Sequence, residues 1–116
     1  MKNANDLLTE HNGSDEYYQH GLSKLHYTNG VQAACEQFKC YWFLDVVMSY
    51  QTKKFQEANE FQVWKLIRKN GNAFIAICED GDDNKIITQI IEFSDFEHDN
   101  LTFWFTNRIV ILPSEY

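Results

Sequence analysis

The chain has 116 residues, of which 44% are hydrophobic, and it carries three cysteines and a formal net charge of −7. One hydrophobic core can form at this length, so we expect a single globular domain, 1–116, that begins with a polar arm at 1–15. No apolar run reaches the roughly 18 residues of a membrane span, and the first residues lack the hydrophobic stretch of a signal peptide. We therefore expect a cytoplasmic protein that does not enter a membrane.

Extended and helical segments follow the arm. Short extended segments are predicted at 16–20 and 25–27. Thr28-Asn29-Gly30 then offers turn and N-cap chemistry, and apolar residues recur at helical spacing from Val31 to Trp42. From Tyr41 to Tyr50 almost every residue is apolar, which predicts a helix that is packed on most of its sides.

Strands are predicted throughout the second half. Apolar residues alternate with a period of two from Phe61 to Ile67, and Asn70-Gly71 is typical of a two-residue hairpin turn that would place Ile67 near Phe74. Further strands are predicted at 86–93, 101–105 and 109–112. We therefore expect an α+β domain in which an N-terminal helical layer packs on a C-terminal antiparallel β-meander of about five strands.

The negative charge is confined to one segment. Residues 1–78 and 100–116 are each electrically balanced, whereas 79–99 contains eight acidic residues and Lys85 as its single basic residue. This acidic block consists of Glu79, Asp80, Asp82, Asp83, Glu92, Asp95, Glu97 and Asp99. It predicts either solvated turns or a surface for a basic protein partner, and it argues against direct binding to nucleic acids, which requires clustered Lys and Arg.

The sequence contains no complete signature of a metal site, a cofactor site or a catalytic motif. Asp80, Asp82 and Asn84 fit the first, third and fifth positions of a calcium loop, but Lys85 stands where that loop needs glycine and Ile91 where it needs glutamate. The histidines lack the spacing of a helical metal pair, and phosphate-binding and nucleophile-elbow motifs are absent. We therefore expect no metal, no cofactor and no catalytic residue.

Asp45 is unusual because it is a carboxylate inside an apolar segment. A buried carboxylate is costly unless it is paired, hydrogen-bonded, protonated or turned toward a cleft. One interpretation is a hydrogen bond to a neighbour such as Tyr41, His20 or His26 that fastens the helix to the N-terminal strands. The other is an acid or base group in an aromatic pocket. The candidate pocket consists of Tyr18, His20, His26, Trp42 and Asp45.

Three segments resemble recurrent segments of a family of small bacterial and phage proteins, a domain of unknown function. They are YWFLD at 41–45, EFQVWKL at 60–66 and LPSEY at 112–116, and YYQH at 17–20 and YTNGV at 27–31 are similar to the family's N-terminal segments. The resemblance covers roughly 17–116. It implies one compact domain and a bacterial or phage setting, and it transfers no catalytic role to any position.

Three functional hypotheses follow from these observations. The first is a non-enzymatic interaction module, carried by a phage or mobile element as an inhibitor or accessory protein, whose acidic block docks on a basic surface of a host protein. The second is an enzyme or small-molecule-binding domain that uses the pocket around Asp45. The third is a nucleic-acid mimic, which needs carboxylates spaced along an extended face.

Overall fold

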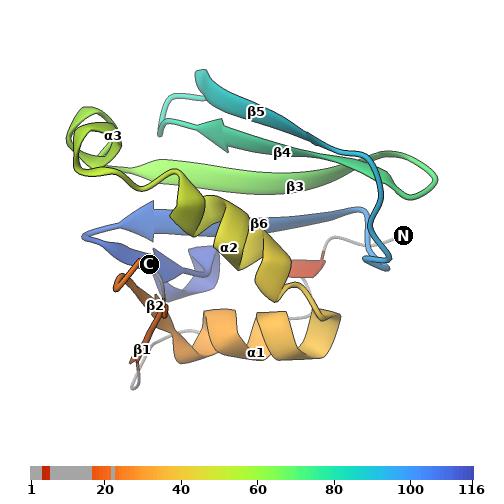
Figure 1. Cartoon of the computed structure of the whole chain (residues 1–116), viewed down its shortest axis with the longest axis horizontal. Coiled ribbons are helices and arrows are strands. Elements are labelled where there is room, and N and C mark those ends of the chain that lie inside the picture. Colours follow the sequence, from red (N-terminus) through yellow and green to blue (C-terminus); the bar gives the residue numbers. More distant parts are fainter. Residues whose placement is uncertain (1–3, 6–16, 22) are drawn as a thin grey trace.

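The computed structural model describes residues 4–5, 17–21 and 23–116, and within them one seven-stranded sheet forms the body of the molecule (Figure 1). The strands are β1 (Tyr17–Gln19), β2 (His26–Thr28), β3 (Gln62–Asn70), β4 (Ala73–Glu79), β5 (Lys85–Ile91), β6 (Asn100–Thr106) and β7 (Ile109–Ile111). Their order across the sheet is β1-β2-β7-β6-β3-β4-β5. Apart from Ala4 and Asn5, the predicted polar arm lies outside the described residues.

The expected meander is wrong, because the sheet is mixed and larger than predicted. β2 pairs in parallel with β7, whereas the other neighbouring strands pair antiparallel. β6 returns to the far side of β3 instead of adding beside β5. The two N-terminal strands therefore extend a sheet that the sequence patterns assigned to the second half alone.

The expected N-terminal helical layer is also wrong. The helices α1 (Asn29–Phe38), α2 (Tyr41–Ser49) and α3 (Lys53–Ala58) lie in the middle of the described chain, between β2 and β3. The side chain of Thr28 accepts a hydrogen bond from the backbone N–H of Val31 and so caps α1. Lys39 adopts a left-handed conformation, φ 54°, and ends α1 there, so the predicted helical region is broken before α2 begins.

The core lies between α1, α2 and one face of the sheet. Figure 1 shows α2 crossing in front of β6 and β3, with α1 near β2. Trp64 on β3 and Phe103 on β6 are fully buried on this face. The ring of Phe43 on α2 stacks on Phe103 with 5.3 Å between centroids, and the ring of Tyr50 lies 5.4 Å from that of Trp64. Burial of these rings stabilises the fold by roughly 1.5–3 kcal/mol for each side chain.

The β3–β4 hairpin forms as predicted, but its register differs by one residue. Asn70 pairs with Ala73, so the turn residues are Gly71 and Asn72, and Gly71 takes the positive φ of 50° that the turn requires. An irregularity between Arg68 and Asn70 shifts the ladder. Ile67 consequently pairs with Ile75, the residue next to Phe74. Among the residues the structure describes, no helix is long and apolar enough to cross a membrane.

Candidate functional site

The structure separates the acidic block into two clusters at opposite ends of the β4–β5 hairpin. The turn cluster is Glu79, Asp80, Asp82 and Asp83, at and between the ends of β4 and β5. The linker cluster is Glu92, Asp95, Glu97 and Asp99, between β5 and β6. The seven residues of β5 lie between them, so the clusters are roughly 20 Å apart at about 3.3 Å per residue.

Two members of the turn cluster are engaged within the protein. The carboxylate of Glu79, with 12% of its side chain exposed, lies 2.7 Å from the ammonium of Lys65. Asp80 accepts hydrogen bonds from the backbone N–H groups of Asn84 and Asp82, at 3.0 and 2.8 Å, and from the side-chain amide of Asn84. These hydrogen bonds hold the pKa of the Asp80 carboxyl below its usual value. Asp80 therefore shapes the turn between β4 and β5.

Arg68 anchors the segment that carries the linker cluster. Its guanidinium donates hydrogen bonds to the carbonyl oxygens of Phe96 and His98, at 2.8 and 3.0 Å, and to the carboxylate of Asp99 at 3.2 Å. The same guanidinium lies 4.6 Å from the ring centroid of Phe74. The linker cluster is thus held beside β3 and β4 at a fixed place.

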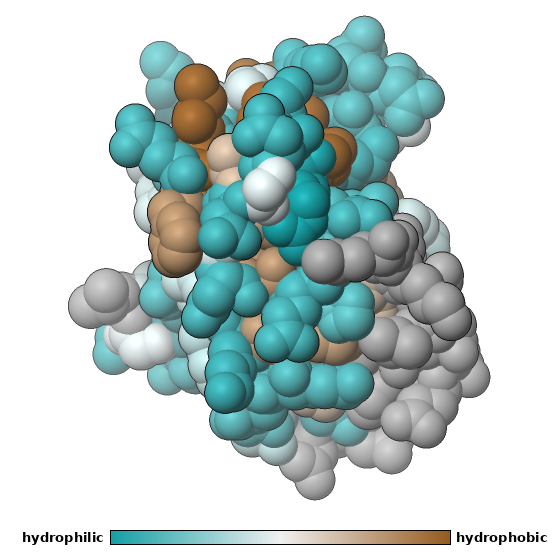
Figure 2. Space-filling model, turned by 90° about the vertical axis from the view of Figure 1, so that its right-hand side faces the viewer, coloured by the Kyte–Doolittle hydropathy of each residue, from teal (hydrophilic) through white to brown (hydrophobic). Residues whose placement is uncertain are grey.

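Five carboxylates of the acidic block are exposed. They are Asp82, Asp83, Glu92, Asp95 and Glu97. Figure 2 views the molecule from the linker end and shows a mostly hydrophilic surface, interrupted by hydrophobic atoms in the upper part. The large apolar side chains that are exposed include Ile90 on β5 and Phe93 just after it.

Asp45 lies on the surface of α2 and contacts His20. Its carboxylate is 2.8 Å from Nε2 of His20, and 66% of its side chain is exposed. Nδ1 of His20 accepts a hydrogen bond from the backbone N–H of Ser23 at 3.2 Å and lies 2.9 Å from the hydroxyl of Ser23. Because Nδ1 is an acceptor, Nε2 carries the proton and donates to Asp45. Ser23, which the sequence analysis missed, follows His20 by three residues in the β1–β2 turn.

The hydrogen-bonded series Ser23, His20 and Asp45 connects the β1–β2 turn to α2. A serine beside an imidazole and a carboxylate has the composition of a nucleophilic triad. Here the serine hydroxyl also accepts a hydrogen bond from the backbone N–H of Leu25 at 3.2 Å, so it is part of the turn. Asp45 therefore has its hydrogen-bond partner, His20, at the surface of α2, and its carboxylate is not buried.

The remaining candidate pocket residues do not line the cavities described below. Tyr18 stacks on Tyr27 with 5.8 Å between ring centroids, and Trp42 lies 6.1 Å from Phe43 in a tilted arrangement. His26 is exposed on β2. Of the five candidates, His20 and Asp45 are brought into contact with each other.

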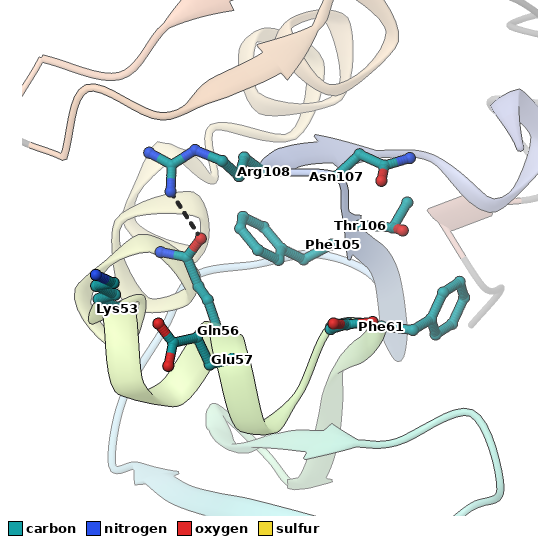
Figure 3. Close-up of a pocket in the computed structure, with 9 residues that line it drawn as sticks. Lys53, Gln56, Glu57, Phe61, Phe105, Thr106, Asn107 and Arg108 are labelled. Atoms are coloured by element: carbon teal, nitrogen blue, oxygen red, sulfur yellow. Dashed lines mark hydrogen bonds between the residues drawn. The ribbon is translucent and has the colours of Figure 1, made fainter.

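A cavity of about 760 Å³ lies between α3 and the β6–β7 turn (Figure 3). It is lined by Lys53, Gln56, Glu57, Glu60, Phe61, Phe105, Thr106, Asn107 and Arg108. Figure 3 shows Arg108 and Gln56 facing each other, and the guanidinium donates to the amide oxygen at 3.1 Å. Two cations and two carboxylates share this rim, so its charge favours neither an anion nor a cation.

Two further cavities touch the acidic clusters. One of about 400 Å³ is lined by Gln37, Phe38, Lys39, Asp95, Glu97 and His98. The other, of about 550 Å³, is lined by Asn5, Phe61, Val63, Lys65, Glu79, Gly81, Asp83, Thr102, Trp104 and Pro113. Each contains a lysine beside the carboxylates, which partly offsets the local negative charge.

These features define a class of protein: a mixed-sheet domain with helices over one face and carboxylates at both ends of one hairpin. The chain belongs to DUF6876, a family of unknown function whose model matches residues 2–116. The expected membership of a family of unknown function is confirmed. No curated protein and no solved structure matches the chain.

Proposed function

We propose that this protein is a non-enzymatic interaction module that binds a basic surface of a partner protein in the cytoplasm of a bacterial or phage-infected cell. The observation that carries the proposal is the placement of the acidic block. Five exposed carboxylates lie at the two ends of the β4–β5 hairpin, while the rest of the sequence is electrically balanced. The bacterial or phage setting rests on the resemblance of the YWFLD, EFQVWKL and LPSEY segments.

The charge distribution suits recognition of a positively charged protein. The exposed carboxylates at each end of the β4–β5 hairpin attract a complementary charge over about one Debye length, roughly 8–10 Å in physiological salt. Such complementarity raises association rates and disfavours acidic partners. The engaged carboxylates of Glu79, Asp80 and Asp99 hold the turn and linker in shape, so the exposed ones are presented at fixed positions.

A matched pair of charge reversals tests this proposal. Asp82→Lys with Glu97→Lys reverses one exposed carboxylate in each cluster, and Glu57→Lys with Glu60→Lys makes the same change in net charge near α3. A partner recovered by affinity purification is titrated with each variant by calorimetry at low and high salt. We expect the first variant to bind at least about tenfold more weakly and the second to bind within about threefold of the original protein.

If the two variants lost the same amount of binding affinity, only the net charge of the protein would matter. That result would contradict a localised docking surface. Affinity that is independent of salt would also contradict the proposal. A small molecule that raises the melting temperature of the original protein but not of Asp45→Asn would favour the pocket hypothesis instead.

A further inference from the structure

We infer that the free edge of β5 accepts an extended segment of the partner as an eighth strand, and that this segment carries Lys or Arg near both of its ends. The inference deepens the proposed function and rests on it, because it names how the basic partner is bound. It combines three features of the described structure: an unpaired strand edge, exposed apolar side chains on and beside that strand, and carboxylates beyond each of its ends.

The edge itself is the first feature. β5 is the last strand in the sheet order, and its backbone pairs with β4 on one side only within the described residues. Figure 1 shows β5 at the top of the sheet with no ribbon above it. Seven residues of strand offer a row of backbone donors and acceptors, which is a template for pairing with another chain. The opposite edge, β1, has three residues and offers a much shorter template.

The side chains of β5 give this edge an apolar character. Ile90 is 75% exposed and Phe93, two residues beyond the end of the strand, is 71% exposed. Ile90 is opposite Ile75 of β4, which is half-buried. An added strand would place its own side chains beside Ile90 on that face and cover part of this apolar surface. β5 has no proline, and Lys85 is its single charged residue.

The charges at the two ends select the occupant. A second copy of this chain pairing antiparallel along β5 would bring the turn cluster of one copy beside the linker cluster of the other, and both are acidic. An extended segment with basic residues at both ends would instead place each cation beside a cluster of carboxylates. About seven residues span the distance between the clusters, which sets the spacing of the basic groups.

The experiment uses a synthetic strand as the probe. The peptide acetyl-KKVTVTVKK-amide has alternating β-branched residues and lysines at both ends. Its control has the same sequence with N-methyl groups on all the central amides, which keeps the charge but blocks pairing along both sides of the strand. We expect the first peptide to bind the full chain at least about tenfold more tightly and to slow amide exchange in β5.

Two adjacent proline substitutions identify the edge directly. Neighbouring amides of a strand point to opposite sides, so one of Thr88→Pro and Gln89→Pro removes an N–H at the free edge and the other removes one that faces β4. We expect the variant that lacks an N–H at the free edge to keep the original fold, as measured by circular dichroism. The same variant should bind the peptide at least about tenfold more weakly. Ile90→Ser, a change at an exposed position, keeps the ladder and should weaken binding about threefold or more.

Equal binding of the two peptides would overturn the edge inference. If that equal binding also depends on Asp82 and Glu97, the proposed function stands while its strand-pairing mode fails. Failure of the unmethylated peptide to bind at low salt would overturn the inference as well. Light scattering that shows a dimer disrupted by the edge proline would identify a second copy as the occupant and would also overturn it.

Discussion

At the scale of single residues, the side-chain amide of Gln62 shows how a polar group is accommodated in this core. Gln62 is fully buried. Its oxygen accepts hydrogen bonds from Nε1 of Trp64 and Nε2 of Gln51, both at 2.7 Å. Its nitrogen donates to the side-chain oxygen of Gln51 and to the carbonyl of Asn59, both at 3.0 Å. The amide therefore joins β3 to the residues on either side of α3.

Replacing Gln62 with leucine should destabilise the protein by about 1–3 kcal/mol. The substitution leaves the indole N–H of Trp64 buried without its acceptor, and such unsatisfied groups cost about this much. Urea unfolding followed by tryptophan fluorescence measures the change. Gln37→Leu, at an exposed position of α1, is the control and should change the free energy of unfolding by less than about 0.5 kcal/mol. Similar values for both variants would refute the role given to the network.

The three thiols should be protected from reagents in the folded protein. Cys35, Cys40 and Cys78 are fully buried. Burial, together with the nearby carboxylates of Glu79 and Asp80, raises the pKa of the Cys78 thiol to about 12. Since the thiolate is the reactive form, modification at pH 8 should require unfolding. Titration with a chromogenic disulfide along a urea gradient should therefore follow the unfolding curve. Rapid reaction of one thiol without urea would contradict this.

At the scale of elements, the N-terminus of α1 is joined to the C-terminal segment. One carboxylate oxygen of Glu115 accepts hydrogen bonds from the hydroxyl of Thr28 at 2.6 Å and from the backbone N–H of Leu112 at 2.8 Å. A Cβ built on Gly30 would lie 2.6 Å from the other oxygen of this carboxylate. Glycine at this position therefore leaves room for Glu115 beside the helix end.

Gly30→Ala should destabilise the protein by about 1–2 kcal/mol, although alanine normally favours helix. The new methyl group displaces the carboxylate of Glu115 and breaks its two hydrogen bonds. In a Glu115→Ala background the same substitution should cost less, and a double-mutant cycle of thermal or urea unfolding measures the difference. Additive effects of the two changes would show that Gly30 and Glu115 are not coupled.

The β4–β5 turn should make a contribution to stability that depends on acid. Hydrogen bonds from Asn84 and then from Asp82 lower the pKa of the Asp80 carboxyl in the folded state, so the unfolded state binds the proton more readily. The contribution is present above the unfolded pKa of about 4 and is lost as the pH falls through the lower folded value. Unfolding of the original protein and of Asp80→Asn should therefore differ most at pH 6, and the difference should shrink as the pH falls below about 4. A constant difference would contradict this assignment.

Local signals in the sequence predicted several of these elements. The N-cap at Thr28, the β3–β4 hairpin and the strand segments in the second half depend on neighbouring residues, so sequence patterns could reveal them. The break at Lys39 could not be predicted, because a lysine takes the left-handed conformation that usually marks glycine. α3, capped by Thr52, lies in a polar segment whose residues show no apolar periodicity.

At the scale of the whole molecule, strand order was beyond the reach of the sequence patterns. The pairing of β2 with β7 joins residues that are more than 80 positions apart, and the sequence of neither segment indicates the strand with which it pairs. The same non-local order makes β5 an edge strand. The separation of the two acidic clusters, in contrast, follows from the seven residues of β5 that lie between them in the sequence. The contact between His20 and Asp45 was among the alternatives for Asp45, but that expectation assumed a buried carboxylate, whereas 66% of the Asp45 side chain is exposed.

The sheet order also predicts that local unfolding begins at the edge of the sheet formed by β1 and β2. β1 and β2 have three residues each and stand at one end of the sheet, whereas β3, β4 and β6 are long strands with buried side chains. The contact between His20 and Asp45 ties the turn between these short strands to α2, and because Asp45 is 66% exposed we assign it less than about 1 kcal/mol. Asp45→Ala should therefore speed amide exchange in β1 and β2 by up to about fivefold and leave β3, β4 and β6 unchanged, as measured by hydrogen exchange and mass spectrometry. Asp82→Ala, which removes an exposed carboxylate in the distant turn cluster, should change neither group. Equal acceleration in all strands after Asp45→Ala would mean that β1 and β2 open only together with the rest of the sheet.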